Sequence, residues 1–399
     1  MAFIPYGAYW STPFARWQGT LAHLNSVEFA AHVGRHELAR IGVSADSFDF
    51  VAFGQTVIQK GSFFGGPWFT GMLGAEGLAA PMVSQACATG ARLLSTAVGE
   101  IAQGASQTLI VSGDRCSNGP HVYFPAPQGP GGTGTHEDVV MDNFGHDPWA
   151  CNAMLQTGEN VAAREGITTE EQHDLALHRR GQYDDALADD RAFQRRFMPV
   201  LKVPDARFRK TVGVLETDEG VEAARPEKLA TLKPVMPGGS ITFAGQTHPA
   251  DGNAGMVVVA DRAHAAEISG DGGGGDGPVV EVIAIAQARE EKGFMPAAPI
   301  KASIAALDRA RLLINQVDAI KSHNPFAVND ITFARAFGID WETMNNYGSS
   351  LIWGHPQGPT GLRAMIELIE ELHIRGGGTG LFQGCAAGDS AMAVVLRVG

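Results

Sequence analysis

Ser84-Gln-Ala-Cys-Ala-Thr-Gly-Ala-Arg92 is the stretch around which the rest of the chain is organised. It is followed by apolar residues at helical spacing, namely Leu93, Leu94, Ala97, Val98 and Ile101. We expect Thr89 or Ser84 to cap this helix, which places Cys87 at or just before its N-terminus. The helix dipole favours a thiolate there, so the position predicts a lowered pKa for Cys87. A buried structural cysteine is the alternative interpretation.

The same pattern recurs near the end of the chain. Thr89-Gly-Ala-Arg92 matches Thr360-Gly-Leu-Arg363 at an offset of 271 residues (360 minus 89), and Gly113 matches Gly384 in the same register. Both copies read as a loop, a helix, a glycine-containing turn and a strand. The repeat predicts an α/β fold of two pseudo-equivalent halves, in which the helices after the Cys87 and His355 loops bring their N-termini to one site.

The other expected elements follow from periodicity and turn residues. Helices are expected at 26–42 (capped by Ser26), 159–189 (with a capping box at Thr168) and 302–316 (with Ile304 inward). Strands are expected at 48–53, 108–112, 240–243, 255–260, 278–284 and 317–320. An aromatic loop at 61–70 and a Pro/Gly loop at 127–134 lie between them, and the glycine-rich stretch 271–278 is predicted to be a flexible joint.

Composition narrows the class of protein. A chain of 399 residues that is 44% hydrophobic can bury a large core, and its net charge of −13 argues against a nucleic-acid or anionic-membrane surface. Four widely spaced cysteines suggest neither disulfides nor a zinc knuckle. The N-terminus has no signal-peptide pattern, and no apolar run is long enough to span a membrane. We therefore expect a cytoplasmic protein with reduced thiols.

Four residues that can do chemistry lie at strand ends or in strand-to-helix loops: Cys87, His323, His355 and Cys385. Active sites of α/β proteins are built at such positions. A thiolate activated by histidine, with a second thiol as proton donor or acceptor, suits acyl transfer through a thioester. Backbone N–H groups near the two cysteines would hold the oxyanion.

These residues also carry a family resemblance: the chain resembles a thiolase over nearly its whole length. The matching elements, in family order, are the Cys87 loop, Ala250-Asp-Gly252, His323-Asn-Pro-Phe326, Gly354-His-Pro356 and the Cys385 loop. The resemblance implies a five-layered αβαβα fold. It implies an N-terminal half at 1–116 and 241–270, an inserted loop domain at 117–240 that covers coenzyme A, and a C-terminal half at 278–399.

The resemblance also implies roles for single residues. Cys87 is the acylated nucleophile, His355 its activating base and an oxyanion donor, and Cys385 the acid/base on the α-carbon. Met154, Thr247 and Phe326 fall where the family lines its pantetheine tunnel. CoA is then a co-substrate, and neither a permanently bound cofactor nor a metal is implied.

The chain departs from the common family pattern at three places. His323 stands where most thiolases have asparagine, which resembles the sterol-carrier-protein type and implies that His323 is an oxyanion donor. Cys385-Ala-Ala387 replaces the usual Cys-x-Gly. The unusual loops at 63–69 and 127–134 would border the acyl pocket, which favours a bulky or aromatic acyl chain such as that of benzoylsuccinyl-CoA.

Two other functions remain open. A ketoacyl-synthase-type condensing enzyme uses one cysteine with two histidines, and Cys385 argues against it. A non-catalytic acyl-CoA-binding subunit of a complex is the second, and the complete residue set argues against that. The resemblance further implies a homodimer or a dimer of dimers, and relatives of this type can pair with a small zinc-ribbon/OB-fold subunit.

Overall fold

The strands of both halves join in one sheet. The computed structural model describes residues 1–270 and 277–399, and within these ranges an 11-stranded sheet and two separate two-stranded sheets form. The halves meet at β1 (Ala2–Pro5), which pairs antiparallel with one strand on each side. The predicted joint at 271–278 falls mainly on residues 271–276, which lie outside the described residues.

Four strands extend from each side of β1. On the N-terminal side they are β11 (Ala250–Val259), β6 (Gln107–Arg115), β4 (Phe50–Gly54) and β5 (Met82–Val83). On the C-terminal side they are β12 (Val279–Arg289), β15 (Ser390–Val398), β14 (Gly378–Ala386) and β13 (Ala319–His323). The short strands β2 (Tyr9–Ser11) and β3 (Ala15–Arg16) also pair with β11. Each half ends in parallel strands. His323 and Cys385 lie near the ends of β13 and β14, and Cys87 and His355 lie in the loops before α3 and α12.

The internal repeat is present in the fold. β6 begins at Gln107 and β14 at Gly378, which is the offset of 271 residues expected from the sequence (378 minus 107). The preceding helices, α3 (Thr89–Ala102) and α12 (Gly358–Ile374), pack against each other between the two half-sheets. One buried apolar cluster contains residues of both helices and of both half-sheets.

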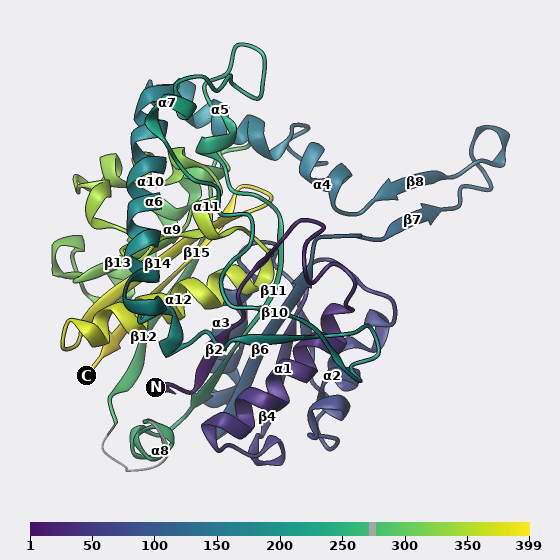
Figure 1. Cartoon of the computed structure of the whole chain (residues 1–399), viewed down its shortest axis with the longest axis vertical. Coiled ribbons are helices and arrows are strands. Elements are labelled where there is room, and N and C mark those ends of the chain that lie inside the picture. Colours follow the sequence, from purple (N-terminus) through teal and green to yellow (C-terminus); the bar gives the residue numbers. More distant parts are fainter. Residues whose placement is uncertain (271–276) are drawn as a thin grey trace.

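Further helices cover the outer faces (Figure 1). α1 (Ser26–Ile41), α2 (Gly65–Leu73) and α8 (Arg262–Ile268) pack on the N-terminal half-sheet. α9 (Ala298–Ala310) and α10 (Ala327–Phe337) enclose the outer core of the C-terminal half. The order from one outer face to the other is α, β, α, β, α, and the predicted fold class is confirmed.

A close backbone crossing sets the distance between α3 and α12. A Cβ atom added to Gly90 would lie 2.5 Å from the backbone N of Leu362 and 3.0 Å from the carbonyl oxygen of Gly358. Carbon and backbone atoms do not approach so closely, so any side chain at Gly90 pushes the helices apart. The crossing therefore fixes how the Cys87 and His355 loops meet.

We expect Gly90→Ala to destabilise the protein by about 1–3 kcal/mol, the usual cost of overpacking, and to lower activity. Gly99 on the same helix is the matched control, because a Cβ there has no atom within 4 Å. Gly99→Ala is expected to stabilise the helix by up to about 1 kcal/mol. Denaturant unfolding of the two variants measures the difference, and equal stabilities would contradict a tight crossing.

Residues 117–240 contain a separate set of elements. These are the helices α4 (Met141–Gly145), α5 (Met154–Glu165), α6 (Thr169–Arg191) and α7 (Pro226–Leu229), with the hairpins β7 (His121–Phe124)–β8 (Thr135–Asp138) and β9 (Leu201–Pro204)–β10 (Thr211–Leu215). The β7–β8 hairpin projects away from the body, and the predicted Pro/Gly loop at 127–134 connects its two strands (Figure 1).

Several local predictions are wrong. The cap of α1 is Asn25, whose side chain accepts from the backbone N–H of Val27, and Ser26 is the first helical residue. The helix predicted at 302–316 begins earlier, at Ala298, and ends at Ala310, because the C-cap residue Arg311 has a φ of 56°. Ile304, predicted to face inward, is 47% exposed. Thr168 does cap α6, since its side chain accepts from the N–H of Glu171.

Two segments change class because of tertiary contacts. The strand predicted at 240–243 is absent, because the carboxylate of Glu159 accepts the backbone N–H groups of Ser240 and Ile241 at 2.8 to 3.0 Å. These donors therefore cannot join a sheet. The aromatic stretch predicted as a loop continues into α2, where Phe69 is buried and stacks on Phe53 at 4.8 Å between ring centroids.

No helix among the described residues is both long and apolar enough to cross a membrane.

Candidate active site

Cys87 lies in a strained turn between β5 and α3. Ala86, directly before it, has a φ of 44°, a conformation that L-residues rarely adopt. Thr89 braces the turn, since its hydroxyl donates to the carbonyl of Ala86 at 2.7 Å and accepts from the N–H of Gln85 at 2.8 Å. The helix begins after Ala88 without a side-chain cap, so the predicted capping by Thr89 or Ser84 is wrong. The position of Cys87 just before the helix is as predicted.

His355 comes from the other half and meets the sulfur directly. Its Nε2 lies 3.1 Å from the Sγ of Cys87, and its Nδ1 lies 2.6 Å from the hydroxyl of Thr360. The backbone N–H of His355 donates to the carbonyl of His248 at 2.9 Å, and its carbonyl accepts from Ala250 at 3.3 Å. The loop before α12 is thus fixed by β11, and the imidazole has one nitrogen for the thiol and one for Thr360.

His323 ends β13 and lies beside His355. The two rings are 4.1 Å apart between centroids. The Nδ1 of His323 is 2.9 Å from the hydroxyl of Ser350, the first residue of α11 (Ser350–Trp353). Within the described ranges its Nε2 has no hydrogen-bond partner, although the side chain is only 1% exposed. The ligand atoms of Cys87, His323 and His355 all lie within 4.8 Å of one another.

Cys385 is buried in β14, close enough to Cys87 for a thiolate there to raise the pKa of Cys385. The amide Nδ2 of Asn329 donates to its Sγ at 3.3 Å. The N–H of Ala387, two residues further on, acts on Cys87 as a hydrogen-bond donor that favours the thiolate. The loop after Cys385 therefore reaches the nucleophile position. All four residues predicted from the sequence are brought together.

The predicted lowering of the Cys87 pKa is wrong. Burial of the sulfur raises the pKa of Cys87 to about 12, and this desolvation outweighs the N–H groups of Ala387 and of Cys87 itself. Burial also lowers the pKa of His323 to about 3 and that of His355 well below its usual value. The resting site is a neutral thiol beside two neutral imidazoles.

Several polar residues at the site were missed by sequence reasoning. Gln357 has a φ of 62° and its Oε1 accepts from the Cys87 thiol at 3.3 Å, so the thiol proton has two acceptors. Asp114, at the end of β6, accepts from the N–H of Gly358 at 3.0 Å and holds the first turn of α12. Gln357 stands next to His355 in sequence, but only the folded contact with Cys87 identifies it.

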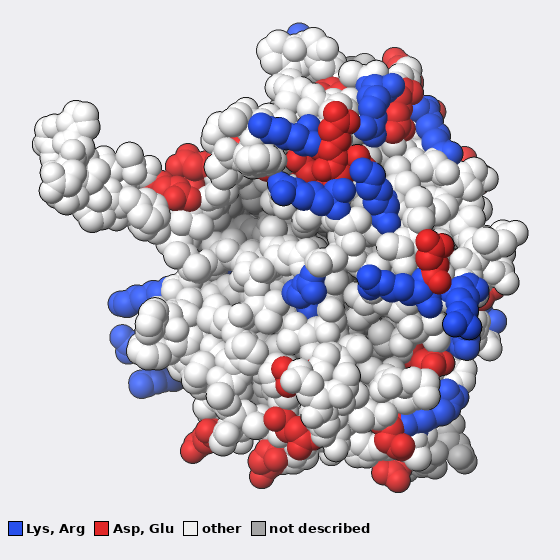
Figure 2. Space-filling view, turned by 180° about the vertical axis from the view of Figure 1, so that it is seen from behind, with Lys and Arg blue, Asp and Glu red and all other residues white. Residues whose placement is uncertain are grey.

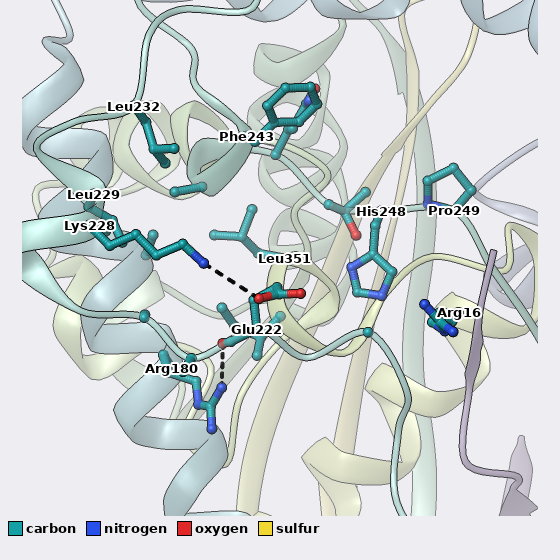
Figure 3. Close-up of a pocket in the computed structure, with 18 of the residues that line it drawn as sticks. Arg16, Arg180, Glu222, Lys228, Leu229, Leu232, Phe243, His248, Pro249 and Leu351 are labelled. Carbon is teal, nitrogen blue, oxygen red and sulfur yellow. Dashed lines mark hydrogen bonds and ion pairs between the residues drawn. The ribbon is translucent and has the colours of Figure 1, made fainter. Parts of the chain in front are cut away.

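A cavity of about 560 Å³ lies next to the site: the carbonyl of its lining residue His248 accepts the backbone N–H of His355, but Cys87, His323, His355 and Cys385 are not among its lining residues. Its lining includes Thr247, His248, Leu351, Arg16, Arg180 and Lys228 (Figure 3). Lys228 forms an ion pair of 3.7 Å with Glu222 across it. From behind, the molecule shows a hollow with Lys and Arg side chains along its edge (Figure 2).

Of the three residues expected to line a pantetheine tunnel, one lines the cavity and two lie elsewhere. Thr247 lines the cavity, and its hydroxyl donates to the carbonyl of Ser350. Met154 and Phe326 are not among the lining residues; they pack in the apolar cluster that contains Cys385. The aromatic residues Phe63 and Phe64 are 92% and 66% exposed, and neither lines this cavity.

Comparison with known protein families identifies the family of the chain. The model of the thiolase N-terminal domain matches residues 8–262, and that of the thiolase C-terminal domain matches residues 277–398. The chain belongs to the thiolase family. This thiolase is thus an acyltransferase whose chemistry uses CoA, as the predicted enzyme class states.

Relatives of this thiolase cover nearly its whole length. An acetyl-CoA acetyltransferase of Syntrophomonas wolfei is 28% identical, over 97% of this chain and 96% of the relative. The β-ketothiolase BktB of Cupriavidus necator is 27% identical, over 97% and 96%. Human mitochondrial 3-ketoacyl-CoA thiolase has the same fold, with a TM-score of 0.89 at 21% identity, over 100% of this chain and 99% of that one.

Proposed function

We propose that this thiolase moves an acyl group between CoA and a thioester on Cys87, and so cleaves or forms a β-ketoacyl-CoA. The observation that carries the proposal is the 3.1 Å contact between the Cys87 Sγ and the His355 Nε2. It pairs a nucleophile with a base from the opposite half, beside a second thiol. Acyl transfer by covalent catalysis needs this combination.

The first step follows from the neutral resting state. As the substrate carbonyl approaches, the Cys87 thiol gives its proton to the Nε2 of His355 while its sulfur attacks. The Nδ1–H of His355 donates to the Thr360 hydroxyl, 2.6 Å away, which orients the ring for this transfer. Because burial raises the pKa of Cys87, the proton leaves during the attack rather than before it.

Charge on the substrate oxygen is stabilised next. His323 and the backbone N–H of Ala387 are the donors that lie against the site, and fixed donors in a buried site stabilise an oxyanion strongly. For His323 this requires a proton on Nε2. The Ser350 hydroxyl provides for that tautomer when it donates to the His323 Nδ1 instead of to the Asn324 Oδ1, 3.1 Å away. Cys385 then gives a proton to, or takes one from, the α-carbon of the second thioester.

CoA is proposed to occupy the cavity next to Thr247. Arg16, Arg180 and Lys228 supply positive charge there for the phosphates, and Thr247 and Leu351 also line this cavity. A structure of human mitochondrial 3-ketoacyl-CoA thiolase in complex with CoA shares the fold, with a TM-score of 0.88. The segment 117–240, which contributes Arg180 and Lys228, is then the CoA-covering domain between the halves 1–116 plus 241–270 and 278–399.

Further properties of this thiolase are inferred from its sequence alone. They are the sterol-carrier-protein type, indicated by His323, and a bulky or aromatic acyl chain such as that of benzoylsuccinyl-CoA. They also include a homodimer or dimer of dimers, a small zinc-ribbon/OB-fold partner and a cytoplasmic location. The acyl chain is the most informative of these to measure.

The proposal is tested by trapping the acyl-enzyme. Full-length protein is incubated with acetyl-CoA and with a panel of aliphatic and aromatic β-ketoacyl-CoA thioesters, and intact mass and peptide mapping follow. We expect one acyl group per chain, on the peptide that contains Cys87, together with release of CoA. A protein that binds these thioesters but neither acylates nor releases CoA is a non-catalytic subunit, and the proposal is then wrong.

Cys385→Ala separates a thiolase from a ketoacyl-synthase-type enzyme. We expect the variant to keep acylation of Cys87 but to lose thiolytic cleavage by a factor of about 10²–10⁴, the usual contribution of a general acid or base. The two half-reactions are measured separately, by mass spectrometry and by loss of the β-ketoacyl-CoA absorbance. Full cleavage activity in Cys385→Ala would favour the synthase.

A further inference from the structure

Cys87, His323 and His355 bring three possible metal ligands close together at the candidate site. One ligand atom of each of these residues lies within 4.8 Å of those of the other two. The Nδ1 of His323 lies 2.9 Å from the Ser350 hydroxyl, which leaves its Nε2 for a metal. His323 is 1% exposed, and its Nε2 has no hydrogen-bond partner among the residues that the structure describes. Buried polar atoms nearly always have a partner, so this nitrogen points to a ligand that the protein can take.

The donor set matches the preferences of Zn²⁺. Thiolate and imidazole are its usual protein ligands, and three protein donors leave a fourth position open. With Zn–N and Zn–S bonds of about 2.0–2.3 Å, tetrahedral ligand atoms are about 3.3–3.6 Å apart. The Sγ of Cys87 and the Nε2 of His355 are already 3.1 Å apart. The widest pair therefore has to close by only about 1 Å.

Hydroxyl groups behind the rings orient both imidazoles for a metal. Thr360 holds the Nδ1 of His355 at 2.6 Å, and Ser350 holds the Nδ1 of His323 at 2.9 Å. The Ser350 hydroxyl can donate to the Oδ1 of Asn324, 3.1 Å away, and then accept from the His323 Nδ1–H. That tautomer leaves a lone pair on Nε2, directed at the site. A group that accepts the other ring N–H of a metal-binding histidine fixes its tautomer and orientation and raises its basicity as a ligand.

We propose that Cys87, His323 and His355 form a reversible inhibitory site for Zn²⁺. On binding, the Cys87 thiol releases its proton to solvent and the thiolate and two neutral imidazoles donate electron pairs to the metal. The fourth ligand is water or the thiolate of a CoA molecule in the adjoining cavity. Bound metal occupies the sulfur and blocks acylation; only this effect on turnover rests on the proposed function, while binding does not.

Direct binding to the full-length protein tests the site. Zn²⁺ is titrated against a chromophoric chelator, and Co²⁺ is used as a spectroscopic probe. We expect one equivalent per chain, with a thiolate-to-cobalt charge-transfer band and tetrahedral d–d bands for Co²⁺. Mg²⁺ is expected not to compete, because it prefers oxygen ligands. Absence of a one-equivalent site, or competition by Mg²⁺, overturns the proposal.

Variants locate the metal. His323→Ala is expected to remove the one-equivalent site. Ser350→Ala is expected to weaken it by about 10- to 100-fold, the usual effect of removing a group that holds a metal-binding histidine. Cys151→Ser is the control, because Cys151 is an exposed free cysteine. If Cys151→Ser removes binding, or if His323→Ala and Ser350→Ala both bind as the wild type does, the metal lies elsewhere and the proposal is overturned. Circular dichroism shows whether each variant is folded.

A second readout separates this proposal from the proposed function. Zn²⁺ is added before acetyl-CoA, and we expect it to prevent acylation of Cys87 and a chelator to restore it. If the wild type is never acylated, the proposed function fails, yet the one-equivalent Zn²⁺ site is still measured. If acylation proceeds normally with the metal bound, the inhibitory site is wrong.

Discussion

Cys87→Ala is expected to abolish the acyl-enzyme and to lower turnover by a factor on the order of 10⁴ or more, comparable with removal of other catalytic nucleophiles. The structure gives the reason. The Cys87 sulfur is the atom that contacts the His355 Nε2, at 3.1 Å, and alanine leaves the base without a nucleophile to activate. Cys385 does not replace it, because its Sγ is held by Asn329 at 3.3 Å in β14.

The measurement is intact mass after incubation with acetyl-CoA, together with the rate of CoA release. Cys151→Ala is the matched control, since Cys151 is exposed and outside the site; we expect it to keep full acylation. An unchanged mass shift in Cys87→Ala would show that another residue is acylated, and the proposed role of Cys87 would be wrong.

His355→Ala is expected to have the next largest effect, a loss of about 10²–10⁴ in the rate of acylation. Burial raises the pKa of the Cys87 thiol to about 12, so few molecules hold a free thiolate at neutral pH. The base therefore has to remove the proton during attack. In this variant the thiol keeps one acceptor, the side-chain amide oxygen Oε1 of Gln357. This oxygen is too weak a base to replace the imidazole.

Single-turnover acylation in a rapid-quench experiment isolates this step from product release. Thr360→Val is the control for positioning: it keeps the imidazole but removes the hydroxyl that holds Nδ1, so we expect a smaller loss than for His355→Ala. Equal rates for His355→Ala and the wild type would exclude His355 as the base.

The architecture was predictable because a duplication is visible in the residues themselves. The match of 89–92 with 360–363 predicted that two helices would present their N-termini to one site, and α3 and α12 do so. Local turn residues and apolar periodicity carry that information without any tertiary contact. For the same reason Cys87, His355 and Cys385 could be assigned to one site before the fold was known.

The parts that failed depend on contacts between distant residues. The Cys87 pKa rises because the sulfur is desolvated in a site shared by both halves, whereas its sequence shows only the helix that follows. The strand predicted at 240–243 fails because the carboxylate of Glu159 takes its donors. Gln357 and Ser350 have no distinguishing pattern in sequence; their roles arise from the side chains that packing places beside them.

The contact between Cys87 and His355 also has a consequence during synthesis of the chain. The two residues are separated by 268 positions, so at about 5–20 residues per second a ribosome takes roughly 15–50 s to add the second after the first. During that interval the cysteine has neither its base nor the C-terminal half that buries it. The Cys87 thiol of the nascent chain is then solvent-accessible. Oxidants therefore reach it most easily during this interval.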